Sequence, residues 1–111
     1  MDTYNGVTMK IDIEATDFEL TESLRDYIEE KIGKLDKLLK SFDEGSVSAR
    51  VEVGRVSKHH KSGDVYRAEA NVRFPGGLIR AEHVGDDVRV AINKVKDKLK
   101  REIKERKRTA Y

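Results

Sequence analysis

The sequence contains no cysteine, no tryptophan and a single proline. Without cysteine it can form no disulfide, no thiolate zinc site and no thiol nucleophile. It also lacks an apolar run near the roughly 18 residues of a membrane span, and residues 1–12 have neither the basic start nor the long apolar run of a signal peptide. We therefore expect a soluble, cytoplasmic protein with no membrane association.

The composition indicates one thin domain. The 111 residues match the length of a single domain, and hydrophobic residues make up 37% of the chain against 40% charged residues. That balance supports one apolar layer between two layers of secondary structure. We expect one domain over residues 1–111, monomeric on its own, with loose ends at about 1–6 and 108–111.

Charge is distributed unevenly along the chain, although the net charge is only +2. Residues 1–30 contain nine acidic and two basic residues, whereas residues 86–111 contain ten basic and five acidic ones. Such a layout favours a polyanion bound against one surface, while the acidic part limits unspecific attachment to nucleic acid.

The spacing of apolar residues predicts a strand followed by a helix. Alternation over 7–13 is typical of a strand with one buried face, and its apolar positions are Val7, Met9, Ile11 and Ile13. Apolar residues then recur at three- and four-residue steps, which predicts a helix from about Glu22 to Ser41 with Thr21 as its N-cap. Gly33 lies inside that helix, at a cost of about 1 kcal/mol relative to alanine.

The second half of the chain predicts three strands and a helix. Alternation places strands at 47–53 and 66–74, with a mobile hairpin loop at 55–64 between them. A turn at 75–77 leads to a short fourth strand at 78–81, and Asp86 or Asp87 caps a last helix that frays in the basic tail. The predicted fold is an α+β, two-layer β-α-β-β-β-α sandwich, with both helices on one face of a four-stranded sheet.

No group of residues indicates catalysis or metal binding. His59 and His60 are neighbours in the loop, His83 ends the fourth strand, and neither thiolates nor a ligand-like spacing accompany them. The acidic residues form no recognisable acid–base pair. We expect surface histidines, no metal, no cofactor, no small-molecule substrate, and a protein that is not an enzyme.

Basic residues recur on one flank of each predicted helix. At about 100° per residue, one sector beside the apolar stripe of the last helix contains Lys94, Lys98, Arg101 and Arg108, with Lys104 at its border and Glu105 within it. The first helix carries Lys34 and Lys37 on its corresponding flank and Lys31 near its apolar stripe. Side-by-side helices would join these residues into one cationic surface. The alternative is a solvated face with pairs such as Lys98 and Glu102.

Aromatic residues are too few for RNA recognition by base stacking. They make up 6% of the chain, and Tyr27, Phe42, Tyr66 and Phe74 occupy apolar positions of the predicted elements. Recognition of the backbone of a structured RNA is therefore favoured.

Two segments carry further motifs. The first, FELTESLRDYIEEKIGKLDKLL, has Arg25, Tyr27, Lys31 and Lys34 after a Leu-Thr turn. The second, EANVRFPGGLIRAEHVGDDVRVAINKVKDKLKREIKERK, combines a Pro-Gly-Gly turn, an acidic cap, Ala-Ile-Asn and Asp-Lys-Leu. In this order and spacing they resemble the ribosome hibernation-promoting factor and ribosome-associated inhibitor family, over about residues 9–107.

The resemblance implies a fold related to double-stranded-RNA-binding domains. It also implies binding to rRNA in the decoding channel of the small ribosomal subunit, which would block mRNA and tRNA binding in stress or stationary phase. Carried over by position and joined to the helix flanks above, the expected rRNA-binding residues are Lys31, Lys34, Lys37, Arg89, Lys94, Lys98, Arg101, Lys104, Lys107 and Arg108.

The chain departs from the family pattern at the start of the last helix. Val88-Arg89 stands where the family has Met-Tyr, and Asn93 where it has aspartate, so Arg89 offers a phosphate contact in place of that tyrosine. Long members carry a C-terminal dimerisation domain that this sequence does not contain. The sequence fits a short member or the N-terminal domain of a long one.

Two other functions stay open at this point. One is a free-standing double-stranded-RNA-binding module, for which plain duplex RNA would compete with ribosomes. The other is a protein-interaction regulatory domain that uses the acidic N-terminal surface, whose binding would tolerate neutralisation of the helix lysines.

Overall fold

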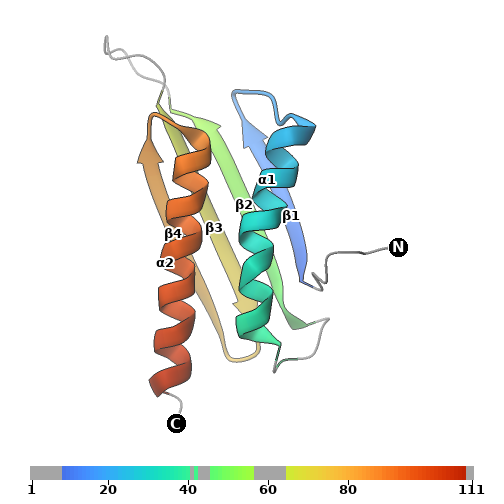
Figure 1. Ribbon diagram of the computed structural model, residues 1–111, viewed down its shortest axis with the longest axis vertical. Coiled ribbons are helices and arrows are strands. Elements are labelled where there is room, and N and C mark those ends of the chain that lie inside the picture. Colours follow the sequence, from blue (N-terminus) through green and yellow to red (C-terminus); the bar gives the residue numbers. More distant parts are fainter. Residues whose placement is uncertain (1–8, 41, 43–45, 57–64, 110–111) are drawn as a thin grey trace.

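Four strands form one sheet, and two helices cover one of its faces (Figure 1). The computed structural model describes residues 9–40, 42, 46–56 and 65–109. The elements are β1 (Lys10–Thr16), α1 (Glu22–Gly33), the 3₁₀ helix η1 (Lys34–Leu39), β2 (Ser48–Arg55), β3 (Tyr66–Phe74), β4 (Gly77–Gly85) and α2 (Val88–Thr109). The predicted α+β class, the element order and the one-sided placement of the helices are confirmed.

The strands follow the chain in space, in the order β1-β2-β3-β4. β1 and β2 are parallel because α1 and η1 carry the chain back across the sheet, whereas β2, β3 and β4 are antiparallel neighbours. β1 and β4 are therefore the two edges. Residues alternate between a covered face and an open face, since successive side chains of a strand point to opposite sides.

The core lies between the covered face of the sheet and the apolar stripes of the helices. α2 contributes every residue of its predicted stripe from Ala91 to Ile103, and α1 contributes Leu24, Ile28 and Ile32. No polar or charged residue is buried among the residues that the structure describes. At about 1.5–3 kcal/mol for each fully buried aliphatic side chain, this layer is the main stabilising feature of the fold.

Two caps and one turn set the boundaries of the elements. Thr21 Oγ1 accepts a hydrogen bond from the Leu24 amide at 3.1 Å, as predicted for an N-cap. Of the two candidate caps of α2, Asp87 has this role: its Oδ1 accepts from the amides of Arg89 and Val90. Gly76 has a φ of +92°, which lets a two-residue turn join β3 to β4.

Several predicted boundaries differ from the structure. The helix expected over 22–41 is α-helical only to Gly33 and continues as η1, because glycine weakens the α-helix and the three-residue spacing of Leu35 and Leu38 suits a 3₁₀ turn. The fourth strand is longer than expected, because 82–85 continue its pairing with β3. α2 includes Arg108, although the sequence predicts a loose end from about residue 108.

The remaining differences lie at the first strand and the loop. β1 is shifted towards Thr16, because Ala15 extends its alternation. β2 continues to Arg55, which was placed in the loop. Val7, Ser41 and residues 57–64 lie outside the described residues, as does the whole predicted N-terminal loose end at 1–6.

Candidate nucleic-acid interface

α1 and α2 lie side by side, and three contacts define the flank of α2 that faces α1. Near the start of α2, the Tyr27 hydroxyl donates to the Arg89 carbonyl oxygen at 3.3 Å, and the Arg89 guanidinium donates to Ser23 Oγ at 2.9 Å. Near its end, Lys107 Nζ donates to the Leu38 carbonyl oxygen at 2.5 Å. Arg89 and Lys107 thus mark one continuous flank.

That flank of α2 is basic along its whole length. Starting from Arg89, steps of three and four residues keep returning to the same side of an α-helix. The positions reached are Arg89, Asn93, Lys96, Lys100, Lys104 and Lys107. None of them is acidic, and Arg89, Lys100 and Lys104 are exposed to solvent.

α1 and η1 add basic residues from the other side. Lys31 is half-buried, four residues after Tyr27, and Lys34 follows at the next step of three. Lys37 extends from η1 on the side of Lys34, because residues three apart are eclipsed in a 3₁₀ helix. We call the combined area the inter-helix cationic surface; it comprises Lys31, Lys34, Lys37, Arg89, Lys96, Lys100, Lys104 and Lys107.

The opposite flank of α2 faces the β4 edge. Lys98 Nζ donates to the Glu82 carbonyl oxygen at 2.7 Å, which anchors this side of the helix to β4. Lys94 and Arg101 lie next to Lys98 around the helix, and Arg108 lies further towards solvent, one helical step after Lys104. Acidic residues are mixed into this flank, and Glu105 forms an ion pair with Arg108 at 2.5 Å. We call these four basic residues the outer flank.

The single cationic surface expected from the sequence is therefore divided in two. The helical wheel grouped the outer-flank residues beside the lysines of α1, whereas the contact of Lys98 places that residue on the other side of α2, towards β4. Lys31, Lys34, Lys37, Arg89, Lys104 and Lys107 are brought together. Lys94, Arg101 and Arg108 lie between Lys104 and Lys98 around the helix, on its solvent side.

Two basic residues of the inter-helix cationic surface were missed as site residues. Lys96 and Lys100 are absent from the rRNA-binding residues expected from the sequence. The signal that identifies them is the three- and four-residue spacing from Arg89 to Lys107 with no acidic residue in it. Choosing that flank from the sequence requires knowing on which side of α2 the first helix lies.

The electrostatic environment at the middle of α2 is positive. Lys96 forms an ion pair with Asp97 at 2.8 Å. The hydrogen bond from Lys96, with the further charges of Lys100 and Lys94, lowers the pKa of the Asp97 carboxyl, although partial burial acts against this. The three lysines around this carboxyl outnumber it, so the net charge at the middle of α2 is positive.

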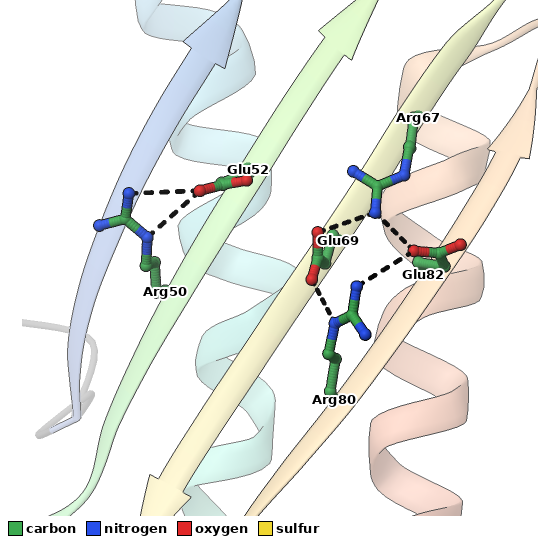
Figure 2. A network of polar contacts seen from close by, with 6 residues as sticks. All are labelled: Arg50, Glu52, Arg67, Glu69, Arg80 and Glu82. Carbon is green, nitrogen blue, oxygen red and sulfur yellow. Dashed lines mark hydrogen bonds and ion pairs between the residues drawn. The ribbon is translucent and has the colours of Figure 1, made fainter. Parts of the chain in front are cut away.

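The open face of the sheet also carries many charged side chains, and those on β2, β3 and β4 that Figure 2 draws form ion pairs. On β3 and β4, Arg67 contacts both Glu69 and Glu82, at 2.9 and 2.5 Å, and Arg80 contacts the same two carboxylates. Hydrogen bonds first from Arg80 and then from Arg67 lower the pKa of Glu69, although partial burial acts against them. On β2, Arg50 joins Glu52 and Glu14.

Other candidate sites find no support in the described part of the chain. No cluster of histidine, aspartate and glutamate there is suited to a metal ion. His83 is half-buried within β4, whereas His59 and His60 lie outside the described residues. Among the described helices, none has the length and apolar character needed to cross a membrane.

Comparison with known sequences gives consistent matches. The family model for "Sigma 54 modulation protein / S30EA ribosomal protein" matches residues 11–110. The ribosome hibernation promotion factor of Deinococcus radiodurans is 34% identical over 86 residues, which cover 78% of this chain and 42% of that protein. The factor of Lactococcus lactis is 33% identical over 100 residues, which cover 89% of this chain and 50% of that protein. The chain spans about half the length of the curated relatives it matches.

Solved structures share the fold. The N-terminal domain of Thermus thermophilus Protein Y superposes with a TM-score of 0.70 at 32% identity, covering 87% of this chain and 98% of that domain. A ribosomal subunit interface protein from Coxiella burnetii superposes with a TM-score of 0.68, and the match covers 89% of this chain and 98% of that one. The second match, at 19% identity, is evidence for the fold alone.

Proposed function

The chain belongs to the family of sigma 54 modulation proteins and S30EA ribosomal proteins, and from this premise we propose that it is a ribosome-binding hibernation factor. It binds rRNA in the decoding channel of the small subunit in stress or stationary phase. There it excludes mRNA and tRNA by occupying their space, so it acts as a plug and not as a catalyst. Its place of action is the cytoplasm, where ribosomes are found.

The observation that carries this proposal is the basic flank of α2 beside α1. Lys100 and Lys104 are exposed, and no carboxylate of the described residues lies within ion-pair distance of them. Phosphates can therefore replace counterions on these side chains without first breaking an ion pair. The low content of aromatic residues agrees with contacts to the RNA backbone.

On this proposal the inter-helix cationic surface and the outer flank contribute unequally to RNA binding. The inter-helix cationic surface supplies most phosphate contacts, because its α2 flank contains no acidic residue. The outer flank, Lys94, Lys98, Arg101 and Arg108, adds weaker contacts, since Glu102 and Glu105 lie among its residues and Glu105 forms an ion pair with Arg108. All ten residues named from the sequence thus remain in the proposed interface, with different weights.

Co-sedimentation with isolated small subunits and intact ribosomes tests the proposal. The purified protein is titrated over a salt series, with naked duplex RNA as competitor. We expect saturable one-to-one binding that duplex does not displace, and an affinity that falls by about 0.7–0.9 log units per log unit of salt for each phosphate neutralised.

Two results would count against it. Equal competition by duplex would identify a general double-stranded-RNA-binding module. Absence of binding to small subunits at low salt would favour a protein-interaction domain, and binding that survives neutralisation of the helix lysines would do the same.

A further inference from the structure

Tyr27 lies between two cations at the Ser23 end of the inter-helix cationic surface. Lys31 Nζ is 5.3 Å from the centre of its ring, and the central carbon of the Arg89 guanidinium is 5.4 Å from the same point. The hydroxyl of Tyr27 also donates to the Arg89 carbonyl oxygen. One half-buried aromatic side chain therefore contacts two basic residues from different helices.

Both cations keep donors available for an anion. The Arg89 guanidinium uses one of its five N–H groups on Ser23 Oγ, and Lys31 has no hydrogen bond or ion pair within the described residues. The nearby cap carboxylate of Asp87 accepts from the backbone amides of Arg89 and Val90, and within the described residues no ion pair joins it to the Arg89 guanidinium. Two like charges are thus held beside one ring, a costly arrangement that an anion would relieve.

We infer that Lys31 and Arg89 form a clamp for one phosphate group of bound RNA, and that Tyr27 is its positioning residue. The guanidinium offers a planar pair of donors to the phosphate, and the lysine brings a second charge on a flexible stem. The tyrosine ring holds both side chains near this place before RNA arrives, which reduces the entropy lost on binding. The inference rests on the proposed function for its ligand, an RNA phosphate.

Arg89 connects the two helices. It stands at the second position of α2, within the first turn that Asp87 caps, and its only side-chain partners in the described structure are Ser23 and the Tyr27 ring. Both partners belong to α1. The clamp therefore depends on the side-by-side packing of the helices and not on α2 alone.

The first experiment separates the ring from the hydroxyl. Tyr27→Phe keeps the ring and loses only the bond to the Arg89 carbonyl, so we expect binding to small subunits within about twofold of the unchanged protein. Tyr27→Leu loses the ring, and we expect about fivefold weaker binding. Arg89→Gln is expected to weaken binding about equally and to lower the salt slope by about 0.7–0.9, the value for one phosphate.

The slope of log affinity against log salt concentration would not change if Tyr27 only supported the fold. Tyr27→Leu is expected to lower this slope as Arg89→Gln does, with a melting temperature close to that of the unchanged protein. The double variant Tyr27→Leu/Arg89→Gln is expected to bind no more weakly than Tyr27→Leu alone. Lys94→Gln on the outer flank is the matched control, and its effect is expected to add to that of Tyr27→Leu. Should Tyr27→Leu fail to fold, Lys31→Gln/Arg89→Gln takes its place.

A second experiment does not need the ribosome. Inorganic pyrophosphate is titrated into the protein and followed by NMR, with expected shifts at Ser23, Tyr27 and the Arg89 side chain. Arg89→Gln is expected to weaken this binding at least about fivefold, and Lys10→Gln, at an exposed lysine of the open face of the sheet, is expected to leave it unchanged. Shifts spread evenly over the lysines of both flanks, or full additivity of Tyr27→Leu and Arg89→Gln, would overturn the clamp. If the protein does not bind small subunits at all, the proposed function fails. The pyrophosphate titration then tests the clamp independently of the ribosome.

Discussion

The helix side and the open face of the sheet both carry many charged side chains but differ in how many of these form ion pairs. On the open face each arginine of the Arg50, Arg67 and Arg80 set contacts a glutamate from a neighbouring position. On the α2 flank that faces α1, five of six positions are basic and none is acidic. Pairing, and not the amount of charge, therefore determines which surface can receive a polyanion.

Strand geometry explains the pairing on the open face. Glu69 and Glu82 are directly opposite each other on β3 and β4, which would be unfavourable without compensation. Arg67 and Arg80 precede them by two residues on their own strands and so flank the carboxylates from both ends (Figure 2). On the helix side, the residues of α1 and η1 that form hydrogen bonds with the facing flank of α2 are Ser23, Tyr27 and Leu38, and none of these three is acidic.

The largest expected effect comes from reversing charge on the inter-helix cationic surface. Lys100→Glu/Lys104→Glu replaces two phosphate contacts by repulsion, and we expect about 100-fold weaker binding to small subunits, or about 2.7 kcal/mol. The matched control is Lys10→Glu/Arg73→Glu, two exposed cations of the open face, with the same change in net charge. Equal loss in both variants would mean that only net charge matters.

A smaller effect is expected on the outer flank of α2. Lys94→Glu/Arg101→Glu should weaken binding about tenfold, because neighbouring Glu102 and Glu105 already reduce the potential there. Fluorescence anisotropy with a labelled protein and small subunits measures the difference. A loss as large as that of Lys100→Glu/Lys104→Glu would show that RNA wraps around both flanks of the helix.

On the open face the expected effect is on stability and not on binding. Glu69 has a side chain only 12% exposed and accepts from two arginines, so Glu69→Gln is expected to lower the free energy of unfolding by about 1 kcal/mol. Urea denaturation measures this loss. Affinity for small subunits should stay within about twofold, and a large loss of affinity at full folding would place RNA on the sheet.

The same residue gives the protein a dependence on pH. The arginines lower the pKa of Glu69 in the folded state, so its stabilising contribution is full above the unfolded pKa of about 4.3 and is lost as the pH falls through the folded value. The stability difference between the unchanged protein and Glu69→Gln should therefore shrink in acid. Denaturation at pH 7, 4 and 3 tests this; a constant difference would show that Glu69 acts through packing.

The smallest effect is expected at the exposed end of the open face. Arg50 and its partner Glu14 are 56% and 57% exposed, so Arg50→Gln should cost only about 0.3 kcal/mol and leave binding unchanged. A cost near that of Glu69→Gln would mean that exposure does not weaken these pairs as assumed.

Much of the fold could be predicted from the spacing of apolar residues. The stripe from Ala91 to Ile103 and the alternation of β2 and β3 are local patterns, and local patterns follow directly from helix and strand geometry. The end of α1 at Gly33 could not be placed, because the same leucine spacing fits an α-helix and a helix that tightens to 3₁₀. The length of β4 depends on pairing with β3, which is not a local property.

The candidate site was predictable only in part, because it also depends on contacts between distant parts of the chain. A helical wheel groups Lys94, Lys98 and Arg101, but it does not show that Lys98 reaches the β4 edge. Nor does it show that Tyr27 meets Arg89 across 62 positions of sequence. Which flank of α2 faces α1 is set by how both helices cross the sheet.

The most direct test of the contrast between the two faces is lysine footprinting in the complex. Acetylation of the protein, alone and bound to small subunits, is read by mass spectrometry at each lysine. We predict strong protection of Lys34, Lys100 and Lys104, with Lys10 on the open face as reactive as in the free protein. Protection of Lys10 with Lys100 and Lys104 left reactive would contradict the assignment of RNA binding to the helix side.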